Sequence, residues 1–211
     1  MLAYVKKHNV PLFRQGEEFG FEKQDSSWRW WSEDKTEEKL PLPRQLALQN
    51  MSTSLMVVDL LQDALPVKRK ALDKALADVT LPGRIQIIPG AVTKILDVSH
   101  NPAAAEFLAN FLQDQTYGGK VRAVFSMLAD KDILGTLHVM RDHVDEWYIA
   151  PLATERGSTL RVLEYCFRTA NILPVHAYDS IEQAYDAALK SAQPDDCVLV
   201  FGSFYTVAAC Q

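Results

Sequence analysis

The sequence predicts an α/β domain with a mainly parallel sheet in residues 81–211, preceded by a smaller, different region in residues 1–80. The first observation is alternation. From residue 81 onward, apolar strand-like runs are separated by helical stretches, which implies right-handed crossovers between parallel strands. The second is that only a short segment, which contains Pro89-Gly90-Ala91, separates the first two runs, so we expect a hairpin that adds one antiparallel strand. The third is length, because 211 residues suffice for one large domain or for a small and a medium one.

The second region is expected to be a single Rossmann-like domain. Its last run, 197–211, is predicted to be a buried strand that leads into a helix. That run is too short to span a bilayer, which takes about 20 residues, and the N-terminus lacks the apolar core of a signal peptide. We therefore expect a cytoplasmic protein without a membrane partner. The predicted strands are 84–88, 93–98, 121–127, 146–150, 173–177 and 197–201, and the predicted helices are 103–113, 133–141, 159–170 and 181–191.

Residues 1–80 have a different pattern. Aromatic or β-branched runs alternate with turn and charge signals, and we expect Trp28, Trp30 and Trp31 to be core and sheet-face residues. A helix is predicted over 50–65, with Asn50 well placed to cap it. The remaining expectations are short runs at 10–14, 19–23 and 27–31, a charged loop at 32–39, a proline-rich, non-helical segment at 40–44, and a linker or short connecting helix after Pro66.

Composition excludes several classes of function. Apolar residues make up 48% of the chain and charged residues 23%, as in an ordinary globular protein. A formal net charge of −5 argues against broad nucleic-acid binding, although it leaves room for a local basic pocket. The three cysteines are widely spaced and form no Cys-x-x-Cys motif, so we expect a reducing compartment and no metal ligands.

Polar side chains gather where the strand at 93–98 ends. Asp97, Ser99 and His100 follow an apolar run, and Asn101-Pro102 favours a helix start, with Asn101 as N-cap and Pro102 at the first helical position. Ligands bind at the carboxyl ends of strands in open α/β sheets. This segment alone is equally consistent with a ligand site and with a capped surface turn.

Other strand ends are expected at the same edge of the sheet. They lead into 126–132, 150–158 and 201–203. Each residue there also has a structural explanation. Ser158 and Ser203 are plausible N-caps, and Lys131 and Asp132 could be solvated first-turn residues. Arg84 could be an exposed strand-edge charge or a ligand for phosphate oxygens.

The chain contains neither Gly-x-x-x-x-Gly-Lys-Ser/Thr nor Gly-x-Gly-x-x-Gly after a strand. Phosphoryl transfer depends on phosphate-binding amides, lysine and Mg²⁺. The sequence therefore predicts groups that assist at a nucleotide site, but no site that could hold a triphosphate by itself.

Four motifs in order resemble a known family. Leu81-Pro-Gly-Arg-Ile-Gln86, Leu96-Asp-Val-Ser-His-Asn-Pro102, Phe125-Ser-Met-Leu-Ala-Asp-Lys-Asp132 and Phe201-Gly-Ser-Phe-Tyr-Thr-Val207 resemble the C-terminal part of folylpolyglutamate synthase. In bacteria that enzyme is usually bifunctional with dihydrofolate synthase, and it belongs to the Mur ligase superfamily. The segment 41–50 resembles the one that closes the family's central ATPase domain.

This resemblance implies an ATP-dependent amide ligation, in which ATP phosphorylates a carboxylate of dihydropteroate or a folate and L-glutamate attacks the acyl phosphate. Asn50, Arg84 and Asp97 match residues that contact ATP, and His100 and Ser203 match positions that hold glutamate. Lys131 and Asp132 lie in a family motif without an assigned role. The resemblance implies no catalytic residue or metal ligand in this chain, and Mg²⁺ bound mainly by the family's N-terminal domain.

The chain departs from the family in lacking its P-loop half. We therefore expect residues 1–80 to be the tail of the central ATPase domain with a linker, and residues 81–211 to be the C-terminal ligase domain. The chain would then be a C-terminal fragment, inactive until it docks onto its own N-terminal P-loop domain. Two alternatives stay open: a non-catalytic module that binds a small anion, and the C-terminal domain of another Mur-type amide ligase.

Overall fold

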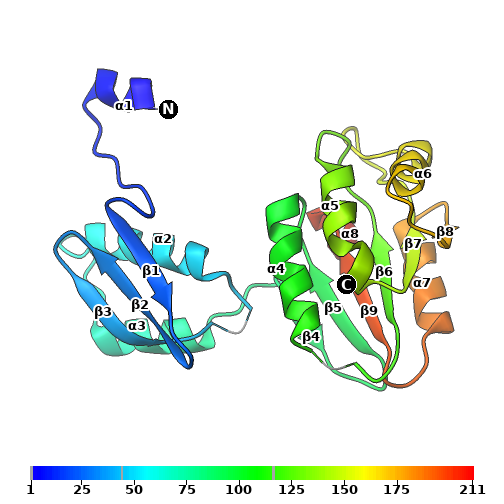
Figure 1. Cartoon of the computed structure of the whole chain (residues 1–211), viewed down its shortest axis with the longest axis horizontal. Coiled ribbons are helices and arrows are strands. Elements are labelled where there is room, and N and C mark those ends of the chain that lie inside the picture. Colours follow the sequence, from blue (N-terminus) through cyan, green and yellow to red (C-terminus); the bar gives the residue numbers. More distant parts are fainter. Residues whose placement is uncertain (1, 44, 116) are drawn as a thin grey trace. The chain divides into compact units, whose positions relative to one another are not determined.

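Two units, Met1–Thr80 and Leu81–Gln211, make up the chain in the computed structural model, which describes residues 2–43, 45–115 and 117–211 (Figure 1). Each unit has its own sheet and its own hydrophobic core. Arg44, at the end of the predicted proline-rich segment, lies outside the described residues. No helix in the described ranges is long and apolar enough to cross a lipid bilayer.

A six-stranded sheet forms the centre of the second unit, in the order β4-β5-β9-β6-β7-β8 (Figure 1). Neighbouring strands are parallel except for β4 and β5, which pair antiparallel. The predicted fold class, a mostly parallel sheet with one antiparallel strand, is confirmed. The strands are β4 (Gln86–Ile88), β5 (Thr93–Asp97), β6 (Val121–Phe125), β7 (Glu146–Ile149), β8 (Val175–Ala177) and β9 (Cys197–Phe201).

Helices cover both faces of this sheet. On one face lie α4 (Pro102–Gln113), α5 (Ile133–Met140) and α6 (Leu160–Thr169). On the other lie α7 (Ile181–Ser191) and the short α8 (Phe204–Ala208). A 3-10 turn, η1 (Arg141–His143), follows α5. Because both faces are covered, β6 and β9 are buried along their whole length, as their continuous apolar sequences predict.

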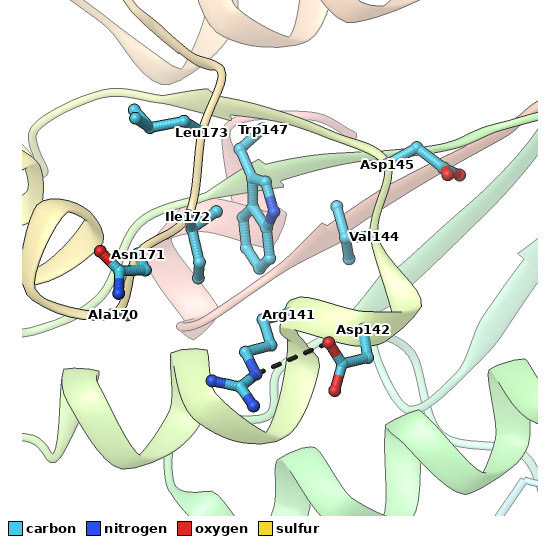
Figure 2. A pocket seen from close by; sticks show the side chains of 9 residues that line it. All are labelled: Arg141, Asp142, Val144, Asp145, Trp147, Ala170, Asn171, Ile172 and Leu173. Carbon is cyan, nitrogen blue, oxygen red and sulfur yellow. Dashed lines mark ion pairs between the residues drawn. The ribbon is translucent and has the colours of Figure 1, made fainter.

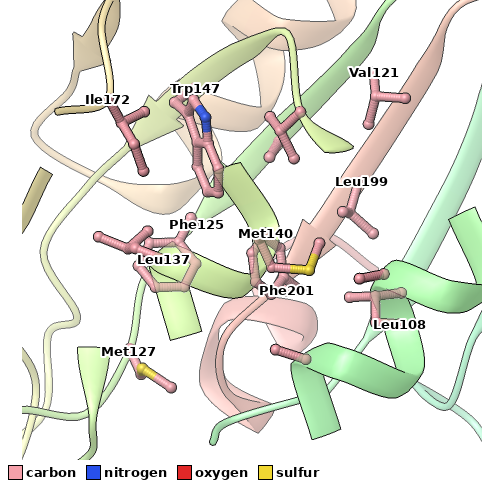
Figure 3. Close-up of a cluster of buried hydrophobic side chains, with 14 of the residues drawn as sticks. Leu108, Val121, Phe125, Met127, Leu137, Met140, Trp147, Ile172, Leu199 and Phe201 are labelled. Carbon is pink, nitrogen blue, oxygen red and sulfur yellow. The ribbon is translucent and has the colours of Figure 1, made fainter. Parts of the chain in front are cut away.

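Aromatic rings fill the core beneath α5 and α6 (Figure 3). The Phe125 ring lies edge-on to Trp147, with centroids 5.9 Å apart, and 4.9 Å from the ring of Phe201. All three side chains are fully or almost fully buried. Since Phe125 and Phe201 end β6 and β9, this packing fixes the strand ends at which the polar loops begin.

The first unit contains an antiparallel sheet of β1 (Phe19–Lys23), β2 (Ser27–Ser32) and β3 (Thr36–Pro41). The helices α2 (Leu48–Leu60) and α3 (Arg69–Asp78) belong to the same unit, as does α1 (Leu2–His8), which buries no residue. Trp28 and Trp30 are core residues, as predicted. Their indole N–H groups donate to the carbonyls of Pro41 (2.9 Å) and Ser52 (3.1 Å).

Three expectations for this unit were wrong. The charged segment 32–39 is not all loop, because β3 begins at Thr36 and pairs with β2. Its polar composition reflects an exposed face, while Leu40 and the ion-paired Glu37 point inward. Residues 10–14 form no strand. The helix predicted over 50–65 runs from Leu48 to Leu60, with Ala47 at the N-cap position, so Asn50 does not cap it.

Candidate functional site

The polar positions predicted from the strand ends come to the carboxyl edge of β5 and β9. Asp97 and Phe201 are register partners in this parallel pair, so Ser203 follows just beyond Asp97. The strand β4 runs antiparallel to β5 with Gln86 opposite Leu96, which brings Arg84 to the same edge. Residues 84, 97, 100 and 203 therefore share one edge of the sheet, where α/β proteins bind ligands.

Asp97 is buried and its carboxylate is held by the chain around it. Its Oδ2 accepts the N–H of Ile85 at 2.9 Å, and its Oδ1 accepts the N–H of Ser99 at 2.8 Å. The Ser99 hydroxyl donates a further bond to the same Oδ1. These bonds fix the direction of the carboxylate and leave it only its remaining lone pairs for a ligand.

The turn that carries Arg84 is tied to the end of β5. The carbonyl of Gly83 accepts the N–H of Val98 at 2.8 Å, and Ile85 donates to Asp97 on the other side of Arg84. Ile85 has a φ of 42° and is almost fully buried, an uncommon conformation for a β-branched residue. Such strained positions persist only where surrounding contacts enforce them.

Arg84 itself is half-buried. Within the described residues, no carboxylate forms an ion pair with its guanidinium. A guanidinium at the ligand-binding edge, with its charge uncompensated there, is well suited to bind phosphate or carboxylate oxygens in pairs.

His100 is oriented by the backbone. Its Nδ1 lies 3.0 Å from the carbonyl oxygen of Val98. Because a carbonyl only accepts, Nδ1 carries the proton in this contact and Nε2 is left for other partners. The half-buried His100 ring lies 6.4 Å from the exposed ring of Phe204, centroid to centroid, so it is next to the start of α8.

Ser203 is the N-cap of α8, which confirms the structural explanation given for this residue from the sequence. Its Oγ accepts the N–H groups of Tyr205 (3.0 Å) and Thr206 (3.2 Å), and the residue is buried. An oxygen that accepts two bonds still has its own proton to donate, so capping leaves the hydroxyl able to bind a carboxylate.

Of the caps predicted around this edge, Asn101 and Ser203 are confirmed and Ser158 is wrong, while Asp132, which was expected in the first turn of a helix, is itself an N-cap. Asn101 caps α4 through the N–H of Ala104 at 2.9 Å, with Pro102 at the first helical position. Asp132 caps α5, and the Lys131 ammonium lies 3.8 Å from Asp130. Ser158 does not cap α6, because its neighbour Thr159 takes that position. The Ser158 hydroxyl is instead buried without a hydrogen-bond partner among the described residues.

Asn50 is exposed in the first turn of α2 and belongs to the other unit. Its contact with the nucleotide stays a prediction. Sequence reasoning overlooked Thr206, whose hydroxyl bonds to the end of β6. One sequence signal could have identified it: Thr206 comes three positions after the predicted N-cap Ser203 and so falls in the first turn of the helix.

Pockets occur at both ends of the sheet. A pocket of about 290 Å³ lies at the amino end of β7, where Figure 2 shows Trp147 between Val144 and Ile172, with Arg141 nearby. None of the predicted site residues lines it. A second pocket, of about 260 Å³, is lined by the loop after β7, the start of α7, and Tyr205 of α8. Of these two pockets, the second adjoins the carboxyl edge that holds the candidate residues, although none of those residues lines it.

The described residues contain no cluster of three or more His, Cys, Asp or Glu side chains that could hold a metal ion.

Comparison with known proteins identifies a family. The sequence family described as "Mur ligase, glutamate ligase domain" matches residues 83–204. The dihydrofolate synthase/folylpolyglutamate synthase of Escherichia coli (strain K12) is 40% identical over 198 residues, which cover 93% of this chain and 45% of that protein.

Solved structures agree. E. coli FolC in complex with DHPP and ADP is 37% identical with a TM-score of 0.83, over 99% of this chain and 49% of that one. A bifunctional folylpolyglutamate synthase/dihydrofolate synthase with Mn, AMPPNP and L-glutamate bound is 36% identical with a TM-score of 0.84, over the same shares. This chain spans about half the length of the curated relatives it matches.

Proposed function

Because this chain belongs to the Mur ligase family, through its glutamate ligase domain, we propose that it is the C-terminal part of an ATP-dependent ligase that joins L-glutamate to dihydropteroate or a folate. The names of the relatives, dihydrofolate synthase and folylpolyglutamate synthase, support this substrate class. The neighbouring structures with ADP, and with AMPPNP and L-glutamate, support a nucleotide and an amino acid as ligands.

The proposed reaction has two steps. A carboxylate oxygen of the folate substrate attacks the γ-phosphorus of ATP, and ADP leaves, so that an acyl phosphate forms. The amine nitrogen of glutamate then attacks the acyl carbon, inorganic phosphate leaves, and the nitrogen loses a proton to give the amide. Because both reactants of the first step are anions, the site has to compensate negative charge.

We assign the nucleotide to Asn50, Arg84 and Asp97. Arg84 would neutralise phosphate charge, which fits a guanidinium without an ion pair among the described residues. The lone pairs of Asp97 that its internal bonds do not use would accept from the ribose or base. Asn50 would contribute its side-chain amide.

We assign the carboxylates of glutamate to His100 and Ser203. The Ser203 proton is available because its oxygen only accepts within the cap. The His100 Nε2 would donate once protonated, since Nδ1 already faces the Val98 carbonyl. Both donors lie at adjacent strand ends, as a ligand with two carboxylates requires.

We place Mg²⁺ mainly in the P-loop part of the enzyme, as the family resemblance implies. The chain has no Gly-x-x-x-x-Gly-Lys-Ser/Thr segment. By itself it should therefore not turn over substrate, and catalysis should require docking onto a P-loop domain.

The observation that carries the proposal is the gathering of Arg84, Asp97, His100 and Ser203 at one edge of a domain that the ligase family matches. The experiment combines this chain with the separately expressed P-loop half of the E. coli relative and measures glutamate-dependent ADP release and folate ligation. The mixture should be active, while neither half should be active alone.

Arg84→Ala should reduce this activity by at least about 100-fold, as loss of a charge-stabilising group at a phosphoryl-transfer site does. The matched control is Arg141→Ala, which removes an exposed arginine at the pocket near the amino end of β7. Equal activity in the two variants would refute the site. Binding of ATP by the chain alone, without metal or partner, would favour the stand-alone anion-binding alternative.

A further inference from the structure

The hydroxyl of Thr206 joins the first turn of α8 to the end of another strand. Its Oγ1 donates to the carbonyl of Ser126 at 2.8 Å, across 80 positions of sequence. Thr206 is completely buried, and Ser126 is the residue that directly follows β6. A buried bond of this kind is specific, because leaving either group unpaired away from water is costly.

A second contact brings the same two segments together. Gly202, which links β9 to α8, has a φ of 113°, and a Cβ built on it would lie 2.3 Å from the Ser126 carbonyl oxygen. Only glycine allows the backbone to pass so close in this conformation. The turn before α8 and the first turn of α8 therefore both contact the same group, the carbonyl of Ser126.

The position of Ser203 depends on this arrangement. Ser203 lies between the two contacts, and its Oγ accepts the N–H groups of Tyr205 and Thr206. The Thr206 Oγ1 also lies near the Ser203 Oγ, at 3.4 Å. Since α8 has only five residues, it is too short to be stable by itself and needs a tertiary anchor to keep its first turn in place.

We propose that Thr206 is a positioning residue for Ser203: its bond to the Ser126 carbonyl fixes the first turn of α8 and so aims the Ser203 hydroxyl at the amino-acid substrate. This inference rests on the proposed function in assigning glutamate to Ser203. Thr206 itself does not touch the substrate. Its loss should weaken glutamate binding without changing the chemistry of phosphoryl transfer.

The test is Thr206→Val, which keeps the shape and removes the donor. Thr136→Val is the matched control, because Thr136 is also completely buried and its Oγ1 also bonds a carbonyl, that of Asp132, at 2.8 Å. Thr206→Ser restores the hydroxyl and should restore function. A tenfold effect, about 1.4 kcal/mol, is the size expected for one buried hydrogen bond.

In the reconstituted ligase, Thr206→Val should raise the KM for glutamate about tenfold, with kcat and the KM for ATP within about twofold of the wild type. In the chain alone, the amides of Tyr205 and Thr206 should exchange hydrogen about tenfold faster in Thr206→Val than in Thr136→Val, while β9 amides exchange equally in both.

The two measurements separate the possible failures. If the wild-type mixture ligates glutamate and Thr206→Val has an unchanged KM, the positioning role is refuted. If the wild-type mixture is inactive, the proposed function fails, and hydrogen exchange still decides whether Thr206 fixes the turn. Slower or unchanged exchange at Tyr205 and Thr206 would overturn the inference in either case.

Discussion

Replacement of Asp196 by asparagine should destabilise the second unit strongly. Asp196 is buried at the amino edge of the sheet, where its carboxylate accepts the N–H groups of Lys120 and Gln193, each at 2.6 Å. It also pairs with Arg122, whose side chain is only 7% exposed. Asparagine keeps the shape but loses the charge and one acceptor oxygen, which leaves the buried guanidinium with Glu146 alone, at 3.1 Å.

Removing one partner of a buried ion pair costs about 3–5 kcal/mol. That is a large part of the about 5–15 kcal/mol by which domains are stable. The matched control is Asp195→Asn, the same chemical change at the exposed neighbour, which should shift stability by no more than about 0.5 kcal/mol. Urea unfolding followed through the exchange of β6 and β9 amides monitors this unit without interference from the tryptophans of the other.

The difference in unfolding free energy between the wild type and Asp196→Asn should depend on pH. Burial alone would raise the pKa of Asp196, but the backbone N–H groups and Arg122 outweigh it and hold the pKa below its usual value. A depressed pKa contributes stability above the unfolded-state value of about 3.9, and this contribution is lost as the pH falls through the lower folded-state pKa. The gap between wild type and Asp196→Asn should therefore be full near neutrality and shrink in strong acid. A gap below about 1 kcal/mol at neutral pH would refute the reasoning.

Three further outcomes are expected. Gly202→Ala should destabilise the unit by at least about 2 kcal/mol in urea unfolding, because it combines a φ of 113° with a clash against a backbone oxygen; a neutral effect would contradict the close approach. Asn101→Ala should cost about 1 kcal/mol and Asn101→Asp almost nothing, since only alanine removes the cap on α4. Burial raises the pKa of the Cys197 and Cys210 thiols to about 12, so a thiol reagent at mildly alkaline pH should modify them only after unfolding; rapid reaction of the native protein would contradict this.

The parallel sheet could be predicted because each of its buried strands is recognisable from its own local sequence. Buried strands such as Cys197–Phe201 are continuous apolar runs between turn residues, and amphipathic helices such as Ile181–Ser191 have clear caps; both have the predicted bounds. Other ends depend on the backbone. The strand β8 begins at Val175 because Pro174 has no N–H to donate to the neighbouring strand. The strand β4 begins after Ile85 because the backbone of Ile85 is in the left-handed region.

What escaped prediction depends on partners distant in sequence. The exposed strand β3 is polar and becomes a strand only because β2 pairs with it. The edge of the candidate site followed from where strands end, but the bonds that orient its residues did not. The contacts between Asp97 and Ile85 and between Thr206 and Ser126 join groups that are 12 and 80 positions apart. No local sequence pattern predicts such contacts.

The strain at Ile85 bears on how variants of Asp97 should be interpreted. Because Asp97 accepts the Ile85 N–H, it helps hold a left-handed, β-branched residue next to Arg84, so Asp97→Ala should also displace Arg84. In the reconstituted ligase, a double-mutant cycle separates this effect from direct contact with the nucleotide. If Asp97 acts partly through Arg84, Asp97→Ala should raise the KM for ATP less in an Arg84→Ala background than in the wild type. Full additivity would show that Asp97 acts on the nucleotide independently of the turn.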